Sequence, residues 1–411
     1  MNARTDASET SKSELTPRVL LCASDNTITS GAFRSCAYLA RELRNYSLSC
    51  TVLLPCVGNG FELLDSLGVD YAVIQSKNWI VDDPLRLNFR TFKKLAALVW
   101  NRLFAYPRIA SYLKQGKIDI VHQNTTWGYI GPKVAMSLGV PVVWHLREFL
   151  EEEQHKRIIC RKRGYRLIEK ADAILTVSEA VASKYRRLLD NDNIKAIHNG
   201  IDPEGFYRGR REILGGETVE MAIVGVLREQ KGHARLLEAL SIYKRECGEA
   251  FHLRVVGIGP DEARLRAMTK ELDLVDEVEF IGAVPHSGDV LNNSDVTFVC
   301  SKAEAFGRVT VEAMMAGCVV IGANTMGTVE VLRDGTTGYL YEETSSQSLA
   351  QVIAHVVGNA EEARLVAAAG QEDAMRRFTV AVNAKNIAGV YADVLERRGK
   401  LDLAQVIRES L

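Results

Sequence analysis

Residues 300–341 read CSKAEAFGRVTVEAMMAGCVVIGANTMGTVEVLRDGTTGYLY. This stretch predicts a strand end, a loop, a helix and a second strand, with Glu304 in the loop and Glu312 on the helix. A loop carboxylate can accept hydrogen bonds from sugar hydroxyls. A carboxylate on the helix can accept hydrogen bonds from both hydroxyls of a ribose. Such charge-assisted bonds are about twice as strong as neutral ones. The pattern indicates a nucleotide-sugar site, but the same spacing also occurs in ordinary solvated acids.

The start of the predicted helix adds a second indication. Its first turn has N–H groups without acceptors inside the helix, so it can bind a pyrophosphate. Gly307 would let the backbone approach such a ligand closely. The residues whose backbone we expect to contribute are Ala305, Phe306, Gly307, Arg308 and Val309.

Short apolar runs alternate with helical patterns on both sides of this stretch, which predicts parallel βαβ units. A chain of 411 residues exceeds what one core usually holds, so we expect two domains, each a doubly wound sheet. Turn residues near 199–203 mark the change between them. The predicted parts are a disordered tail 1–17, a first domain 18–200, a linker 201–216, a second domain 217–375 and C-terminal helices 376–411.

The composition is that of an ordinary soluble protein, with 47% hydrophobic residues and a net charge of −1. Residues 1–200 carry 28 Lys and Arg against 20 Asp and Glu, and the remainder carries 23 against 32. No collective charge predicts nucleic-acid binding, although a basic first half suits an anionic surface or a phosphorylated acceptor. Eight scattered cysteines without a C-x-x-C pair indicate reduced, buried thiols and a cytoplasmic location. The polar N-terminus has no apolar segment of the kind a signal peptide needs.

A turn near the start of the second domain, Gly225–Gly232, carries cations. Transfer from a nucleotide sugar leaves a diphosphate, whose developing charge needs preorganised cations. We therefore expect Lys231 to contact the diphosphate, and Arg228 to be a second cation in the same loop. Taken alone, both residues would be interpreted as surface cations on an exposed turn.

From about Arg18 to Leu395 the chain resembles the retaining GT-B glycosyltransferases of family four, the group 1 class, whose E-x7-E motif matches Glu304 and Glu312. The resemblance implies two Rossmann-like domains that face a central cleft, and a terminal helix from Arg376 that returns to the first domain. It places Glu304 beside the donor sugar and Glu312 on the ribose. Relatives often carry an Arg where this chain has Val226, and a glycine where it has Met326.

The resemblance also implies further site residues. His145, at the end of a buried strand, would position the sugar from the first domain, with Arg147 and Glu148 as candidates on the acceptor side. By themselves, such strand-end residues are usually structural. Donor-side positions are expected at Gly31, Gly225, Gly257 and Val284.

The predicted function is retaining transfer of a sugar from a nucleoside-diphosphate sugar to an acceptor hydroxyl, in envelope polysaccharide or glycolipid synthesis. The leaving phosphate would help to take the acceptor proton, and neither a metal nor a cofactor is expected. Two alternatives stay open. One is a nucleotide-sugar epimerase, and the other is a relative that binds nucleotide sugars without catalysis.

Residues 86–117 combine eight Lys and Arg with no acid. Their apolar residues approximate one helical face: Leu87, Phe89, Phe92, Leu95, Leu98, Val99, Leu103 and Phe104. A second basic run follows at 155–166. A core-packing helix is one interpretation. The other is a patch that holds the protein to anionic lipid at the inner face of the membrane, which would imply a lipid-linked or membrane-presented acceptor.

Overall fold

The computed structural model describes residues 15–85 and 89–411. Most of the predicted tail 1–17, and Leu87 of the predicted apolar face, lie outside these residues. The chain forms two compact units, one of residues 1–200 and 380–411 and the other of residues 201–379. The stretch 201–216, expected as a linker, belongs to the second unit. No helix among the described residues is long and apolar enough to cross a membrane.

The first unit contains a seven-stranded parallel sheet in the order β3-β2-β1-β5-β6-β8-β9. Strand β1, RVLLC, is buried on both faces after Arg18, as is typical of a parallel strand in a sheet that helices cover on both sides. The strands are β1 Arg18–Cys22, β2 Ser49–Leu54, β3 Asp70–Val73, β5 Ile120–Gln123, β6 Val142–Leu146, β8 Ala173–Thr176 and β9 Ile194–Ala196. A separate antiparallel ribbon pairs β4 Ile80–Asp82 with β7 Lys156–Ile158.

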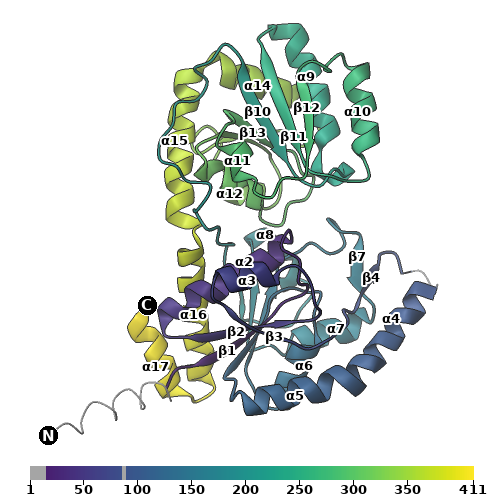
Figure 1. Ribbon diagram of the computed structural model, residues 1–411, viewed down its shortest axis with the longest axis vertical. Coiled ribbons are helices and arrows are strands. Elements are labelled where there is room, and N and C mark those ends of the chain that lie inside the picture. Colours follow the sequence, from purple (N-terminus) through teal and green to yellow (C-terminus); the bar gives the residue numbers. More distant parts are fainter. Residues whose placement is uncertain (1–14, 86–88) are drawn as a thin grey trace, which may run out of the picture. The chain divides into compact units, whose positions relative to one another are not determined.

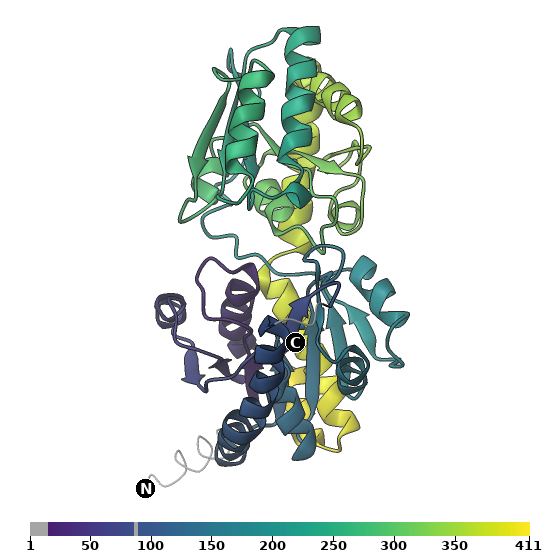
Figure 2. The same cartoon turned by 90° about the vertical axis from the view of Figure 1, so that its right-hand side faces the viewer.

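Helices α2, α16 and α17 pack on one side of this sheet, as Figures 1 and 2 show, and α5 and α6 pack together elsewhere on the unit. The C-terminal helix α16 is part of the core, with Ala384, Ile387, Tyr391 and Leu395 packed among residues of β1, β2 and α2. The helices are α2 Gly31–Leu43, α3 Phe61–Ser66, α4 Phe89–Trp100, α5 Tyr106–Gln115, α6 Ile130–Ser137, α7 Arg161–Ile168, α8 Glu179–Arg186, α16 Val380–Arg397 and α17 Leu401–Ser410. Short turns η1 Arg44–Tyr46 and η2 Asn101–Ala105 follow α2 and α4.

The second unit is a six-stranded parallel sheet in the order β12-β11-β10-β13-β14-β15. Helices α9 and α14 pack against each other, whereas α12 packs against α15 and β14. The strands are β10 Val219–Val224, β11 Phe251–Val256, β12 Val278–Gly282, β13 Val296–Val299, β14 Val319–Ala323 and β15 Tyr339–Tyr341. The helices are η3 Glu229–Lys231, α9 His233–Cys247, α10 Glu262–Glu271, α11 Gly288–Leu291, α12 Arg308–Met315, α13 Thr328–Val331, α14 Ser346–Gly358 and α15 Ala360–Arg377.

The helix expected to begin at Arg376 and return to the first domain starts later. Helix α15 ends at Arg377 and α16 begins at Val380. The break lets Thr379 pair with Ile201, whose N–H also donates to the carbonyl of Phe378 at 2.8 Å. This backbone pairing joins the two segments at which the chain passes from one unit to the other. It also satisfies backbone groups that would otherwise be unpaired.

All eight cysteines carry free thiols. Five are buried as expected, but Cys56 and Cys247 are exposed and Cys160 is half-buried. Cys56 follows the end of β2, and Cys247 is the last residue of α9, so both lie at the ends of elements where side chains reach solvent.

Candidate functional site

The strand order of the second unit changes direction between β10 and β13, which are neighbours. The chain runs from β10 outward to β12 and then resumes at β13 on the other side of β10. In open parallel sheets ligands bind at such a switch point, outside the carboxyl ends of the strands. The turns that follow β10 and β13 carry the residues predicted to bind the donor.

These two turns are locked together by close backbone contact. Gly232 has a φ of +72°, and a Cβ there would lie 2.1 Å from the carbonyl oxygen of Cys300. The N–H of Lys302 donates to the carbonyl of Gln230 at 2.9 Å. Only glycine permits this approach, so the turn that carries Lys231 has a fixed position against the end of β13.

Lys231 and Glu304 form an ion pair in this place. The Lys231 Nζ donates to Glu304 Oε2 at 2.8 Å, and the two side chains are 28% and 15% exposed. Burial raises the pKa of Glu304, but the Lys231 charge, together with hydrogen bonds from Lys231, Ser301 and the Gly307 N–H, outweighs it and holds this pKa below its usual value. The carboxylate is therefore ionised and its partner cation is held beside it.

Gly307 marks the start of α12 and adopts a φ of +84°. A Cβ there would lie 2.7 Å from Thr310 Oγ1, so the left-handed turn into the helix depends on glycine. Ala305 and Phe306 are buried, and the Phe306 ring packs edge-on against Phe378 with centroids 5.7 Å apart. Any ligand contact from these two residues would come from their backbone.

Glu312 lies in α12 and is only 5% exposed. Arg308, one helical turn earlier, points its guanidinium at Glu312 Oε1 at 3.4 Å, and the Ser287 hydroxyl donates to Oε2 at 3.2 Å. Both oxygens thus have a donor, which orients the carboxylate. Val309 in the same first turn is half-buried.

Ser287 was not predicted. It lies in the loop after β12, 25 residues before Glu312, and no motif connects the two. The available signal was its place in a loop that follows the carboxyl end of a predicted strand, at the same edge of the sheet as the other turns.

Arg228 and Val226 occupy the exposed part of the turn after β10. Val226 is 50% exposed, and the Arg228 N–H closes the turn on the Val226 carbonyl at 2.8 Å. Within the described part of the chain, the Arg228 guanidinium has no ion pair. An exposed cation therefore accompanies Lys231 in one short turn.

The other glycines on this side have packing roles in the structure. A Cβ on Gly257, whose φ is +136°, would lie 1.9 Å from the Gly225 carbonyl oxygen. Gly259 approaches the Leu227 carbonyl in the same way, at 2.3 Å from its built Cβ. The GxG pattern thus supports the turn after β10. Val284 is half-buried and packs beside Ala222, Val256 and Val290.

Met326 adopts a left-handed backbone conformation with a φ of +40°. A non-glycine residue in this region carries strain. The neighbouring Gly327 donates its N–H to the Glu304 carbonyl at 3.0 Å, so this turn also supports the loop of Glu304.

His145 ends β6 in the first unit and is fully buried. Neither ring nitrogen has a hydrogen-bond partner among residues 15–85 and 89–411. Burial, with the charges of Arg147 and His122, lowers the pKa of His145 well below its usual value, so its imidazole is neutral. His122 lies 5.5 Å away, centroid to centroid, and bonds the Tyr391 hydroxyl at 2.6 Å.

Arg147 and Glu148 belong to a buried polar network. The Arg147 Nε donates to the Asn124 carbonyl at 2.8 Å, and Glu148 Oε2 accepts from the Thr126 N–H at 3.3 Å and from the Thr126 hydroxyl at 3.1 Å. Burial raises the pKa of Glu148 despite these bonds. Both side chains are less than 10% exposed, at 8% and 7%.

Gly31 begins α2, next to the switch point between β1 and β5. Ser30 precedes it. Its hydroxyl accepts from the Phe33 N–H at 3.4 Å and donates to Asp25 at 3.1 Å. Ser30 therefore serves as the N-cap of α2.

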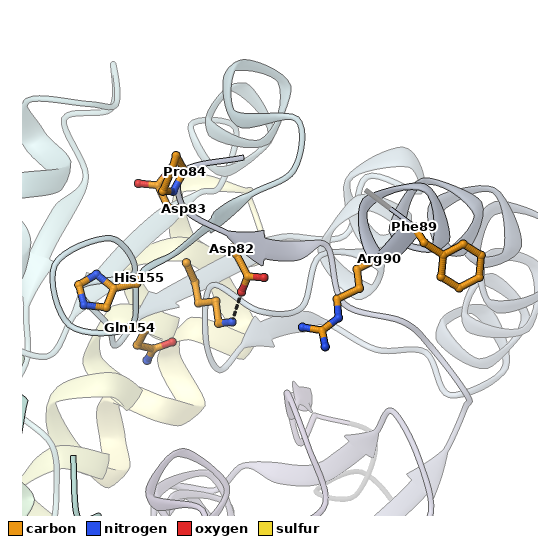
Figure 3. Close-up of a pocket in the computed structure, with 8 residues that line it drawn as sticks. Asp82, Asp83, Pro84, Phe89, Arg90, Gln154 and His155 are labelled. Atoms are coloured by element: carbon orange, nitrogen blue, oxygen red, sulfur yellow. Dashed lines mark hydrogen bonds and ion pairs between the residues drawn. The ribbon is translucent and has the colours of Figure 1, made fainter. Parts of the chain in front are cut away.

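A cavity of about 630 Å³ lies elsewhere, between the β4–β7 ribbon and the start of α4. Figure 3 shows its lining, including Asp82, Arg90 and His155. Asp82 pairs with Lys156, the dashed contact in Figure 3, and Asp83 pairs with Arg157 at 3.5 Å. The predicted donor residues lie in the other unit and do not line it.

Two family models match this chain. Residues 29–204 match the model described as Glycosyltransferase Family 4, and residues 211–373 match the model described as Glycosyl transferases group 1. The second match spans the turns that hold Lys231, Glu304 and Glu312.

Among curated proteins, the chain is 34% identical over 230 residues to phosphatidyl-myo-inositol mannosyltransferase of Mycobacterium leprae, covering 55% of this chain and 58% of that protein. It is 26% identical over 243 residues to N-acetyl-alpha-D-glucosaminyl L-malate synthase of Bacillus anthracis, covering 57% and 63%. These alignments thus span about three fifths of each relative.

Among solved structures, HepE of Anabaena in complex with UDP and glucose has a TM-score of 0.73 at 21% identity. The match covers 92% of this chain and 100% of that chain. At this identity the likeness shows the fold, which is GT-B, as the sequence predicted.

Proposed function

Since the chain belongs to the group 1 glycosyltransferases, we propose that it transfers a sugar from a nucleoside-diphosphate sugar to an acceptor hydroxyl, with retention of the anomeric configuration. The observation that carries the proposal is the Lys231–Glu304 pair at the switch point of the second sheet. A cation and an ionised carboxylate are held together where a donor would place its diphosphate and its sugar.

Lys231 supplies positive charge to the diphosphate. Its charge gains importance as the bond to the sugar breaks, because negative charge then develops on the leaving group. When the donor binds, the Lys231 ammonium turns from Glu304 to the phosphate oxygens, and Glu304 accepts hydrogen bonds from sugar hydroxyls. Arg228 is the second cation, and the leaving phosphate takes part in removing the acceptor proton without a metal.

Glu312 binds the ribose. Its two oxygens can each accept one of the neighbouring ribose hydroxyls, and charge-assisted bonds of this kind are among the stronger ones. Arg308 and Ser287 hold the Glu312 carboxylate in one rotamer. Less conformational entropy is then lost when the donor binds.

The first unit supplies the acceptor side. We assign His145 to sugar positioning, with Arg147 and Glu148 as acceptor-side groups and Gly31 as a close backbone contact. The family match over residues 29–204 supports this assignment. The neutral state of the His145 imidazole fits a hydrogen-bonding role better than a role as a charged group.

The names of relatives support the classes of donor and acceptor. HepE has been solved with UDP-glucose, and other relatives are named for transfer to phosphatidyl-myo-inositol, inositol phosphate or malate, or for colanic acid synthesis. We propose a glycan or lipid-linked acceptor of the cell envelope, and a protein that works in the cytoplasm at the inner face of the membrane.

Thermal unfolding with UDP-, GDP- and ADP-sugars tests the donor class. A ligand at about 100 times its dissociation constant adds about 2.7 kcal/mol of stability. We expect one nucleotide series to stabilise the wild type and to stabilise Glu312→Ala much less. Absence of any shift contradicts the proposal.

Donor turnover separates the remaining alternatives. We expect slow hydrolysis of the bound donor, and the anomer released first reports retention. Conversion of the donor alone into its epimer would favour an epimerase, and binding without any hydrolysis would favour a non-catalytic protein.

A further inference from the structure

Helix α4 and the π turn η2 that follows it expose six large apolar residues and bury two polar ones, Thr91 and Asn101. A usual surface helix turns its apolar residues toward the core. The exposed fractions are 82% for Phe89, 62% for Phe92, 40% for Leu95, 58% for Val99, 61% for Leu103 and 46% for Phe104. We call these six residues the α4 apolar face.

The inward side explains why the helix is held in this rotation. Asn101 is fully buried, accepts from the Lys77 N–H at 2.9 Å, and donates to the Lys77 carbonyl at 2.7 Å and to the Tyr129 hydroxyl at 3.0 Å. About two turns earlier, Lys94 donates to the side chain of Asn78, and Thr91 is buried. Turning the apolar face inward would break these buried hydrogen bonds, which is costly.

The reversal stops at the π turn. In α5, the next segment of the same helical run, Ile109 and Leu113 are buried in the ordinary way and the helix packs on α6. A π turn inserts an extra residue, shifts the faces of a helix, and often marks a functional place. The exposed apolar face is thus a local feature of residues 89–104.

The charge around this face is of one sign. Between Asp83 and Asp119 the sequence has no acidic residue. Arg90, Lys93 and Arg102 are exposed on α4 and η2. Figure 1 shows α4 along the outer edge of the first unit, and in Figure 3 the Arg90 side chain points toward Asp82.

The second basic run contributes less than the sequence suggested. Lys156, Arg157 and Arg161 pair with Asp82, Asp83 and Glu151. Acids from other segments therefore neutralise about half of that run, and only Lys162, Arg163 and Arg166 of α7 are exposed cations. The α4 apolar face has its own exposed cations, Arg90, Lys93 and Arg102, and does not need those of the second run.

We propose that the α4 apolar face lies in the interface of a bilayer that contains anionic lipid. The phenyl and aliphatic side chains enter the boundary between headgroups and acyl chains, and Arg90, Lys93 and Arg102 contact lipid phosphates. The charge selects this occupant over a second copy of the chain, because self-association through this face would oppose cations to cations. The inference does not depend on the proposed sugar transfer.

Vesicle flotation of the full chain tests the proposal. We expect the protein to float with phosphatidylcholine vesicles that contain phosphatidylglycerol at low salt, and to float less at high salt because screening weakens the attraction. With phosphatidylcholine alone we expect little binding. Absence of flotation with the anionic vesicles at low salt overturns the proposal.

Variants locate the contact. Phe92→Ser with Val99→Ser should weaken binding about tenfold or more, because two exposed apolar side chains no longer enter the bilayer. Lys93→Ala should weaken it roughly fivefold. The matched controls are Leu365→Ser, an exposed leucine of α15 with 74% exposure, and Lys170→Ala, an exposed lysine of the first unit, and both should bind as the wild type does.

Two results would overturn the assignment of this face. One is undiminished flotation of the Phe92/Val99 double variant, which would place the membrane contact elsewhere. The other is a dimer in light scattering that the double variant loses, which would identify a second copy as the occupant. Donor-induced thermal stabilisation, measured in parallel, checks that the variants fold and separates a failure here from a failure of the proposed function.

Discussion

The turn after β13 in the second unit and the end of β6 in the first unit both lie at the carboxyl ends of strands in parallel sheets, yet their polar groups have different surroundings. Glu304 after β13 remains partly exposed and has a cation at 2.8 Å. His145 at the end of β6 is fully buried, and both ring nitrogens lack hydrogen bonds within the described part of the chain. The first place is open to a ligand and electrostatically prepared, whereas the second is closed in this structure.

The difference shows that a polar residue at a strand end makes a binding site only if its position is fixed while its side chain remains accessible to a ligand. In the second unit, Gly232 and Gly307 bring backbones close enough to fix Lys231 and Glu304 while both keep contact with solvent. In the first unit, Arg147 and Glu148 form hydrogen bonds with residues of the same domain, Asn124 and Thr126.

The largest effect is expected at Lys231. Lys231→Ala should lower kcat roughly 100- to 1,000-fold with little change in donor affinity, because the loss of one preorganised partner of developing charge costs about 3–4 kcal/mol. Steady-state kinetics with the donor found by thermal shift measures it. The control is Lys302→Ala in the next turn, whose lysine pairs with exposed Glu229 at 2.9 Å and should be near neutral. Equal effects of the two variants would erase the contrast.

Glu312→Ala should weaken binding of the free nucleoside diphosphate about 10- to 100-fold, since hydrogen bonds to a charged group contribute about 1.5–3 kcal/mol. Isothermal calorimetry with wild type, Glu312→Ala and Glu312→Gln gives the ranking, with Gln intermediate. Ser287→Ala should have a smaller effect in the same direction, because the hydroxyl only orients the carboxylate. Unchanged affinity in Glu312→Ala would remove this residue from the site.

Histidine burial in the first unit predicts loss of stability in acid. Burial, with the Arg147 charge, lowers the pKa of His122 to about 3, and the pKa of His145 is also well below its usual value. The unfolded chain therefore binds protons below pH 6.5 that the folded chain does not, so stability is full above pH 6.5 and falls as the pH drops toward 3. At pH 5 each histidine should cost about 2 kcal/mol.

Urea unfolding of wild type and His145→Gln at pH 7 and pH 5 measures this effect. The variant should lose less stability between the two pH values than the wild type does. The exposed control His355→Gln should lose as much stability as the wild type. An equally large loss in His145→Gln would mean that the His145 imidazole takes up protons in the folded chain.

The smallest effect is expected at Arg228. This exposed cation is mobile in water, so Arg228→Ala should lower kcat/KM by tenfold or less. The effect should decrease at high salt, unlike that of Lys231→Ala. A silent variant would leave Lys231 as the single cation of the turn and would sharpen the comparison.

Sequence patterns predicted the parts of the site that one continuous segment encodes. Glu304, Gly307 and Glu312 belong to a single strand–turn–helix unit, in which spacing alone determines geometry. Ser287 was missed because only the fold brings it to Glu312. The short strands β4 and β7 pair only because the fold joins segments that are far apart in the sequence.

Burial limits prediction in the same way. The apolar residues of α4 were recognisable as one face, but their outward rotation depends on Asn101 and its distant partners Lys77 and Tyr129. The neutralisation of Lys156 and Arg157 depends on a ribbon formed with residues far away in the sequence. Contacts between remote segments decide which charges and which apolar groups remain available.

The return of the chain at Val380 has a consequence for protein synthesis. Helix α16 completes the core of the first unit, where Tyr391 bonds His122, but the ribosome makes it after the whole second unit. At about 5–20 residues per second, residues 201–379 emerge over roughly 10 to 35 s. During that time the first sheet exposes the apolar groove that α16 will fill. We therefore expect the nascent first domain to stay incomplete until the last segment is translated, because that segment closes its core.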